Sequence, residues 1–231
     1  MEERYYLVLV NTRTLIRLED LILLMTTTNS DQIQLYTNME KPYGRTYGQW
    51  TVEWWRWALS IPLRGNPFTD KNGEHWNNSQ PPADVWFLVE NIGGKGKTYP
   101  HRNIKLESGR SLLFPVLNCE ANALEYPDLK THEDILRHVV DDVNTVVKRQ
   151  VIINGSRLNP IRIPSDPRIF RVTISEDNAF GIKNHGSTDA AADGYWVFLK
   201  PLPPGFYNIS LEGSCEFGRL NSGAVYEIEV I

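Results

Sequence analysis

The sequence predicts a mainly β protein: an antiparallel, Ig-like β-sandwich with two helices packed against it. Apolar and alternating segments follow one another at short intervals from about residue 150, separated by turns that contain Pro and Gly, which is typical of sandwiches. Two other segments, near 47–60 and 131–150, have the periodicity of helices. Strands and helices do not alternate regularly, so a parallel nucleotide-binding sheet is not expected.

The first helix is expected in a tryptophan-rich segment near residues 47–60. Three of its tryptophans recur at the spacing of one helix face: Trp50, Trp54 and Trp57. Thr46 and Gln49 have the spacing of a capping box, in which a hydroxyl and an amide satisfy free backbone donors, and Pro62 cannot continue a helix. Because tryptophan has the largest apolar side chain, we expect this face to be internal scaffolding packed on the sheet.

An irregular loop is expected between this helix and the first strands. The stretch from Arg64 to Asp84 is rich in Pro, Asn, Asp and Gly. Val85–Val89 and Ser111–Leu117 are then predicted to be buried strands, and Pro115 within the second indicates an edge or a bulge.

The second helix is expected over Thr131 to Gln150, which has the clearest helical periodicity in the chain. Its apolar face is predicted to carry Ile135, Val139, Val143 and Val147. Thr131 is a suitable N-cap. Acidic residues occupy the first turn and Lys148 and Arg149 the last, an order that complements the helix dipole.

The remaining strands are predicted from alternating or continuous apolar runs. They are Val151–Leu158, Ile169–Ile174, Tyr195–Leu199, Phe206–Leu211 and Ala224–Ile231. The first contains Asn154-Gly155, which is the strongest short hairpin signal because both turn positions need a positive φ.

Residues 41–231 are predicted to form a single β-sandwich domain, and residues 1–40 an N-terminal extension that is weakly packed or non-native. Met25, followed by a polar run, would be an ordinary start for a shorter protein. The competing interpretation is a strand at Tyr5 to Val10 followed by a helix at Thr14 to Leu24. Charged residues interrupt the apolar runs, so neither a signal peptide nor a membrane span is expected, and a cytoplasmic protein is the default prediction.

The charge and cysteine content narrow the classes of partner. The net charge is -4, with 24 basic and 28 acidic residues, and no basic stripe is present, so a nucleic-acid partner is not expected. A disulfide between Cys119 and Cys215 is open from the sequence, but two cysteines do not form a disulfide framework. Two reduced, partly buried thiols are the favoured interpretation.

Four segments carry a resemblance to a group of known proteins: Trp50–Pro62 (WTVEWWRWALSIP), Val85–Leu88 (VWFL), Gly109–Asn118 (GRSLLFPVLN) and Asp193–Gly205 (DGYWVFLKPLPPG). They resemble segments of an uncharacterised group of prokaryotic β-sandwich proteins, over roughly Tyr43 to Ile231. The resemblance implies a sandwich but no established chemistry. Relatives look exported and carry cysteines near the positions of Trp76 and Ile104, which this chain lacks, so an extracellular, disulfide-dependent role is not implied.

One candidate site is acidic. Asn118, Glu120 and Glu125 follow an apolar strand, and Asp142 lies on the second predicted helix beside His138. Calcium and other divalent metals take oxygen ligands of this kind, and two close carboxyl groups can also act as an acid–base pair. Glu120, Glu125 and Asp142 are therefore the candidate metal ligands, with a solvated loop as the alternative interpretation.

The other candidate site is aromatic. Trp55 lies off the sheet-facing side of its helix and Trp76 lies on the long loop beside His75, so we expect both indoles to be partly exposed and able to contact a ligand. No catalytic motif is found, and no cofactor is expected. Two functions follow as hypotheses: a non-enzymatic binding or interaction module for a glycan or a protein, or a metal-dependent hydrolase that uses Glu120 and Glu125.

Overall fold

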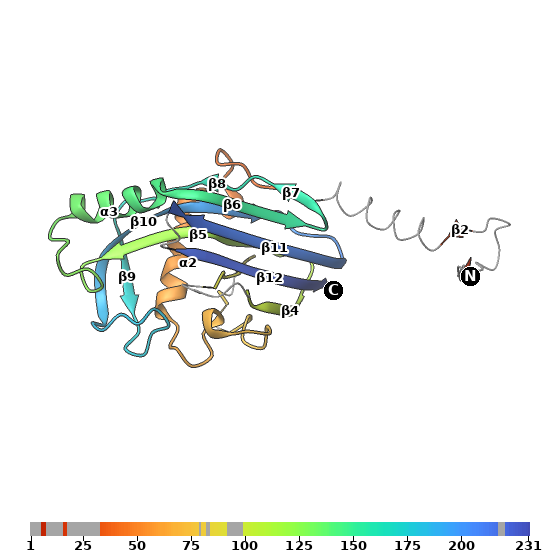
Figure 1. Cartoon of the computed structure of the whole chain (residues 1–231), viewed down its shortest axis with the longest axis horizontal. Coiled ribbons are helices and arrows are strands. Elements are labelled where there is room, and N and C mark those ends of the chain that lie inside the picture. The colour runs from red at the N-terminus through yellow and green to blue at the C-terminus, as the bar shows by residue number, and fades with distance from the viewer. Residues whose placement is uncertain are drawn as a thin grey trace.

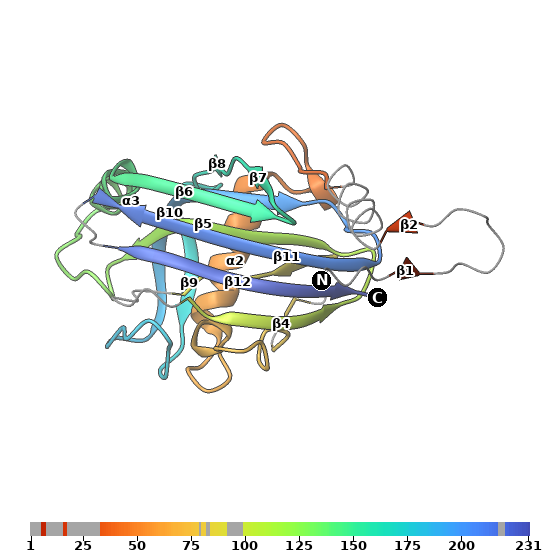
Figure 2. The same ribbon diagram turned by 45° about the vertical axis from the view of Figure 1, so that its right-hand side comes forward.

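The protein is a β-sandwich of two five-stranded sheets, seen in a computed structural model. The structure describes residues 6–7, 16–17, 33–78, 80–81, 84–91, 99–216 and 220–231. Figures 1 and 2 show the two sheets stacked, with a helix crossing the far side of one of them. The predicted fold class is confirmed at this level.

The first sheet has the strand order β3-β5-β10-β8, and β9 also pairs with β10. Its strands are β3 (Val85–Phe87), β5 (Ser111–Asn122), β8 (Ile161–Arg162), β9 (Phe170–Ile174) and β10 (Gly186–Leu199). The pairs are antiparallel except β3 with β5. That pair is parallel because the chain crosses to the other sheet between the two strands and returns in the original direction.

The second sheet has the strand order β4-β12-β11-β6-β7. Its strands are β4 (His101–Leu106), β6 (Val146–Ile153), β7 (Ser156–Leu158), β11 (Gly205–Cys215) and β12 (Asn221–Val230). The hairpin predicted at Asn154-Gly155 is confirmed, with φ of 49° and 81° between β6 and β7. One pair, β4 with β12, is parallel, so the sandwich is mixed rather than wholly antiparallel.

Two apolar layers hold these elements together. Between the sheets lie side chains from both inner faces, including Phe114, Val197, Ile209, Tyr226 and Ile228. On the outer face of the first sheet lies α2 (Tyr47–Ser60), whose three face-sharing tryptophans are buried against Phe87, Trp196 and Phe198. The scaffolding role predicted for this helix is confirmed.

The ends of α2 form as the sequence predicts. The Thr46–Gln49 capping box is present, and the helix ends at Ser60 before the extended Ile61 and Pro62. Trp54 is fully buried, and its indole Nε1 donates to the carbonyl of Leu88 at 3.0 Å. Two 3-10 turns, η1 (Pro42–Gly44) and η2 (Pro67–Thr69), flank the helix.

The second helix, α3 (His132–Asn144), is shorter than predicted. Thr131 caps it, with a capping box to Asp134. The prediction of helix to Gln150 is wrong, because residues from Val146 onward belong to β6 and pair with β11. Val147 is accordingly 61% exposed instead of lining the helix's apolar face. A run of β-branched residues suits a strand, and pairing with β11 decides between the two conformations.

The N-terminal part is described only in places. The strands β1 (Tyr6–Leu7) and β2 (Ile16–Arg17) pair antiparallel, so the helix considered over Thr14 to Leu24 is not found at Ile16–Arg17. The rest of that interpretation lies outside the described residues. Leu35 pairs with Leu199 of β10, and Glu40 forms an ion pair with Lys200 at 2.9 Å. Residues 33–40, assigned above to the extension, therefore contact the sandwich.

The strand β5 has a bulge and a free edge. Tyr195 pairs with Leu117 and Trp196 with Pro115, so Val116 is an extra residue in β5, as Pro115 indicated. β3 accompanies β5 only to Leu113. Beyond that residue, β5 has a ladder partner on one side alone within the described chain.

No helix among the described residues is both long and apolar enough to cross a membrane.

Candidate functional site

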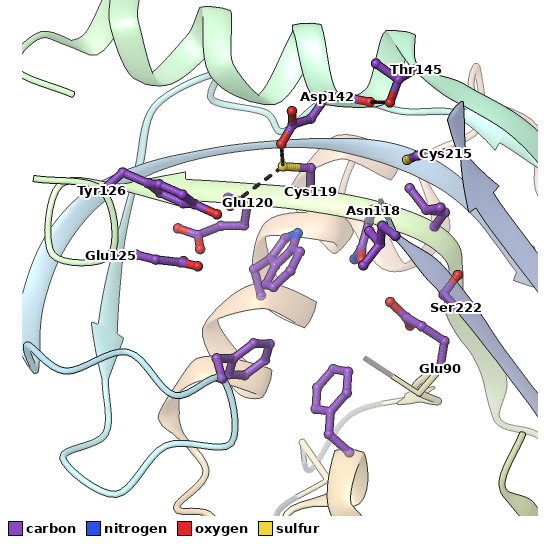
Figure 3. Close-up of a pocket in the computed structure, with 15 residues that line it drawn as sticks. Glu90, Asn118, Cys119, Glu120, Glu125, Tyr126, Asp142, Thr145, Cys215 and Ser222 are labelled. Atoms are coloured by element: carbon purple, nitrogen blue, oxygen red, sulfur yellow. Dashed lines mark hydrogen bonds between the residues drawn. The ribbon is translucent and has the colours of Figure 1, made fainter. Parts of the chain in front are cut away.

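A cavity of about 310 Å³ lies at the free edge of β5. Side chains from distant segments line it: α2, η2, the end of the β3 segment, β5 with its following loop, α3, the loop before β10, and the adjoining ends of β11 and β12. Figure 3 shows carboxyl, amide, thiol and phenol groups pointing into this space from several directions. Polar side chains thus come together where β5 of the first sheet has no neighbouring strand on one side in the described chain.

The bulge in β5 decides which side chains enter the cavity. Before it, Leu112 and Phe114 face the second sheet and Leu113 faces α2. An extra residue inverts this alternation, so Cys119 and Ala121 lie with α3. Glu120 consequently points to the side of α2, opposite Ala192 of β10. Without the bulge, the carboxyl group of Glu120 would face the opposite side of the sheet.

Gly194 leaves room for a residue of the cavity. It pairs with Asn118 across the ladder, and a Cβ atom at position 194 would lie 2.5 Å from the Asn118 Cβ. Any larger side chain would therefore displace Asn118. The position of Asn118 in the cavity lining explains why a glycine occurs at position 194 in the otherwise buried apolar run of β10.

Three buried polar atoms in this cavity have no hydrogen-bond partner among the described residues: Trp55 Nε1, Glu90 Oε2 and Asn118 Nδ2. The residues are 6%, 4% and 8% exposed, respectively. An unpaired buried polar atom costs about 1–3 kcal/mol of stability. Buried groups of this kind are rare in native proteins, and three of them belong to residues that line one cavity.

Glu90 is an acid held in an apolar setting. Burial raises its pKa from 4.5 to about 8, against an opposing hydrogen bond of its own backbone and the attraction of Arg102. The Arg102 guanidinium does not point its donors at this carboxyl group. It donates instead to Val89 O at 2.6 Å, Asp70 O at 2.9 Å and Tyr226 Oη at 2.6 Å. The carboxyl oxygen of Glu90 therefore stays available to the cavity.

Glu120 and Glu125 form a pair of neighbouring acidic residues in the cavity lining. Burial raises the pKa of Glu120 to about 8, opposed by a hydrogen bond from Asn122 and reinforced by the nearby charge of Glu125. Burial also raises the pKa of Glu125, against a hydrogen bond from Tyr126. Asn122 contacts both residues. Its Nδ2 donates to the carboxyl Oε1 of Glu120 at 3.1 Å, and its Oδ1 accepts from the backbone N–H of Glu125 at 3.0 Å. The structure brings these two predicted residues together.

Asp142 lies on the other side of β5. Figure 3 shows it above the strand, beside Cys119, while Glu120 and Glu125 lie below. The Cys119 thiol donates to Asp142 Oδ2 at 3.5 Å, and burial raises the pKa of that thiol. His138 Nε2 lies 3.6 Å from the same Asp142 oxygen. Cys119 and Cys215 are both free thiols, as favoured from the sequence.

The three predicted metal ligands therefore do not converge on one point. Among the described residues, no group of three or more His, Cys, Asp or Glu side chains is arranged to hold a metal ion. Elsewhere, the Asp70 carboxylate accepts four backbone N–H groups, including His75 N at 2.7 Å, so its oxygens are already paired within the loop. Metal binding stays a prediction from the sequence.

The predicted aromatic residues separate into two groups. The expectation that Trp55 and Trp76 are partly exposed is wrong for both, but the indole of Trp55 lines the cavity. Trp76 is 8% exposed and packs its ring 4.8 Å from that of Trp86, away from the cavity. His75 is half-buried on the same loop and also lies outside the cavity lining. Helix periodicity could not place Trp55, because α2 is covered on more than its sheet-facing side.

Sequence reasoning missed Glu90 and Tyr126. Glu90 directly follows the apolar run Val85–Val89. A single carboxyl group at the end of a buried strand is the one feature of the sequence that could have marked Glu90 as a site residue. Glu90 reaches the site because the next residue, Asn91, pairs with Gly223 of β12. That pairing joins residues far apart in the chain and leaves no local pattern.

Comparisons of the chain with protein-family models, with curated proteins and with solved structures found no match. The resemblance to prokaryotic sandwich proteins accordingly stays a prediction. The chemistry of the cavity has to be argued from its own residues.

Proposed function

We propose that the protein is a non-enzymatic binding module whose cavity holds a small polyhydroxylated ligand, such as the terminal unit of a glycan. The cavity, at about 310 Å³, is at the small end of the range usual for ligand sites. A space of that size suits one sugar unit better than the extended contact surface of a protein partner.

The lining has the mixture that a sugar requires. Rings of Trp55, Phe68, Tyr126 and Phe180 supply apolar surface against which the faces of a sugar can pack. Carboxyl and amide groups stand beside those rings, and a hydroxyl group can both donate to and accept from such groups. A purely apolar ligand would leave the polar groups unpaired.

The observation that carries the proposal is the set of three buried, unpaired polar atoms at one cavity. Trp55 Nε1 and Asn118 Nδ2 are donors, and Glu90 Oε2 is an acceptor or, when protonated, a donor. A ligand with several hydroxyl groups can pair all three atoms in one binding event. The stability lost by leaving them unpaired would then be recovered in the complex.

The proposal is tested by calorimetric titration with a panel of monosaccharides and short oligosaccharides. The expected result is saturable binding of at least one sugar. Asn118→Ala should weaken that binding about tenfold, the value of one hydrogen bond in a desolvated site. Asn77→Ala, which changes an exposed amide outside the cavity, is the matched control. Absence of binding across the panel, or equal losses in both variants, would refute the proposal.

A second candidate function is favoured by the Glu120–Glu125 pair. Burial raises the pKa of Glu120 to about 8, so this group can hold a proton near neutral pH as a general acid requires, and Glu125 adjoins it as the second carboxyl group. The metal-dependent form of this hydrolase is the one predicted from the sequence. It is tested by assaying chromogenic glycosides and esters with and without calcium or a chelator. A calcium-induced thermal shift and hydrolysis that both disappear in Glu120→Gln would favour it over the binding module.

A further inference from the structure

We infer that the ligand of the proposed sugar site carries a positive charge, and that it is an amino sugar whose ammonium group binds the buried carboxyl groups of the cavity. This inference rests on the proposed function and specifies its ligand class. Two independent observations carry it: the lining has several carboxyl groups and no cationic side chain, and unpaired donors lie beside them.

The lining is acidic and lacks a cationic side chain. Four carboxyl groups reach it, from Glu90, Glu120, Glu125 and Asp142, and none of the described lining residues is Lys, Arg or His. The nearby Arg102 directs its guanidinium to backbone carbonyls and to Tyr226. An anionic ligand such as a phosphate or a sugar acid would find no cationic partner among these lining residues, and its charge would oppose ionisation of the carboxyl groups.

The buried carboxyl groups have few partners of their own. Glu90 Oε2 has none in the described chain, and Glu120 accepts only from the Asn122 amide, at 3.1 and 3.3 Å. Burial keeps these groups protonated near neutral pH in the free protein, and an ammonium group beside one of them favours its charged form. The charge-assisted hydrogen bond that results is roughly twice as strong as a neutral one. An ammonium group has three N–H donors and a positive charge, and can form such bonds.

A simple alkylamine would not complete the site. Trp55 Nε1 and Asn118 Nδ2 are donors and need acceptors on the ligand. Ring and hydroxyl oxygens of a sugar supply these, while the amino substituent pairs with the carboxyl groups. The aromatic rings of Phe68 and Phe180, 5.0 Å apart, offer a face to the ring and to the cation.

The test compares glucosamine, N-acetylglucosamine and glucose by calorimetry with the wild-type protein at about pH 7, where an amine with a pKa near 8 is largely charged. The three ligands share a ring and differ at one substituent. We expect glucosamine to bind about tenfold or more tightly than the other two. Comparable binding of all three would overturn the charged-ligand inference and leave the sugar site standing, whereas binding of none would also remove the proposed function.

A variant pair makes the result specific to the cavity. Glu90→Gln keeps the shape of the side chain and removes its ability to ionise when an ammonium group binds, so it should lower glucosamine affinity about tenfold and change glucose affinity little. Glu107→Gln changes an exposed carboxylate and is the matched control. An equal loss for both sugars in Glu90→Gln would contradict a charge-specific role. The wild-type comparison decides the inference even when the variant does not fold.

Discussion

The buried acids Glu90 and Glu120 make the stability of the protein depend on pH in an unusual direction. Burial raises the pKa of each from 4.5 to about 8. In the folded protein both groups therefore keep their protons up to about pH 8, whereas in the unfolded chain they lose them near 4.5. The unfolded state binds fewer protons between these values, so stability falls as pH rises through this window. The contribution is complete below pH 4.5 and lost above 8.

The size of the effect follows from linkage. Each group lowers the free energy of unfolding by about 1.4 kcal/mol per pH unit inside the window. Two groups over the range from about pH 5.5 to 7.5 then remove roughly 5 kcal/mol, a large share of the ~5–15 kcal/mol typical of a folded domain. Most acidic side chains act in the opposite direction, because their native pKa values are lowered.

The assay is urea unfolding at a series of pH values from about 5.5 to 7.5 at constant ionic strength. The midpoint should fall steadily over this range. Glu90→Gln removes one of the two titrating groups and should roughly halve the slope, while Glu107→Gln leaves it unchanged. A flat stability profile in the wild-type protein, or the full slope in Glu90→Gln, would show that these carboxyl groups are not buried as described.

Three further substitutions test the scaffold and its link to the site. Trp54→Ala removes a fully buried indole and should lower the free energy of unfolding by about 4 kcal/mol, which corresponds to a fall of about 10 °C in Tm. An unchanged Tm would contradict the position of Trp54 in the core. Gly194→Ala places a Cβ 2.5 Å from that of Asn118 and should weaken sugar binding about tenfold in calorimetry, whereas wild-type affinity would show that Asn118 is not held there. Arg162→Ala leaves Asp193, which it contacts at 2.7 Å, buried without its cation, and should cost about 3 kcal/mol in urea unfolding; a loss below about 1 kcal/mol would contradict that role.

Elements with local signals could be predicted from the sequence. The capping box at Thr46 and the Asn154-Gly155 turn involve residues within a few positions of one another, and both form as expected. The end of α3 is different. Val146 and the residues after it continue the helical pattern, but they pair with β11, about sixty residues further along the chain. Nothing near Val146 in the sequence encodes that pairing.

The candidate site was only partly predictable for the same reason. Glu120 and Glu125 are neighbours in sequence and stay neighbours in space through Asn122. The side of the sheet that Glu120 faces depends on the bulge opposite Tyr195, of which Pro115 gave only a hint. Asp142 has the right residue type but lies across the strand. The inward position of a side chain is a property of the pairing between strands, which periodicity alone cannot supply.

Unpaired polar atoms occur both in the core and at the cavity, and the difference between them supports the proposed function. The indole N–H groups of Trp55, Trp57 and Trp196 are all buried without partners in the described chain, and all three rings lie within the aromatic core against α2, but Trp55 also lines the cavity. Their cost is offset there by the large apolar area of each ring. The Glu90 and Asn118 side chains bury little apolar area in compensation, and they border an open space. A ligand in that space would pair these side chains and give a reason for their burial. The helix α2 therefore has two roles under the proposed function: it stabilises the sandwich and, through Trp55, forms one wall of the candidate site.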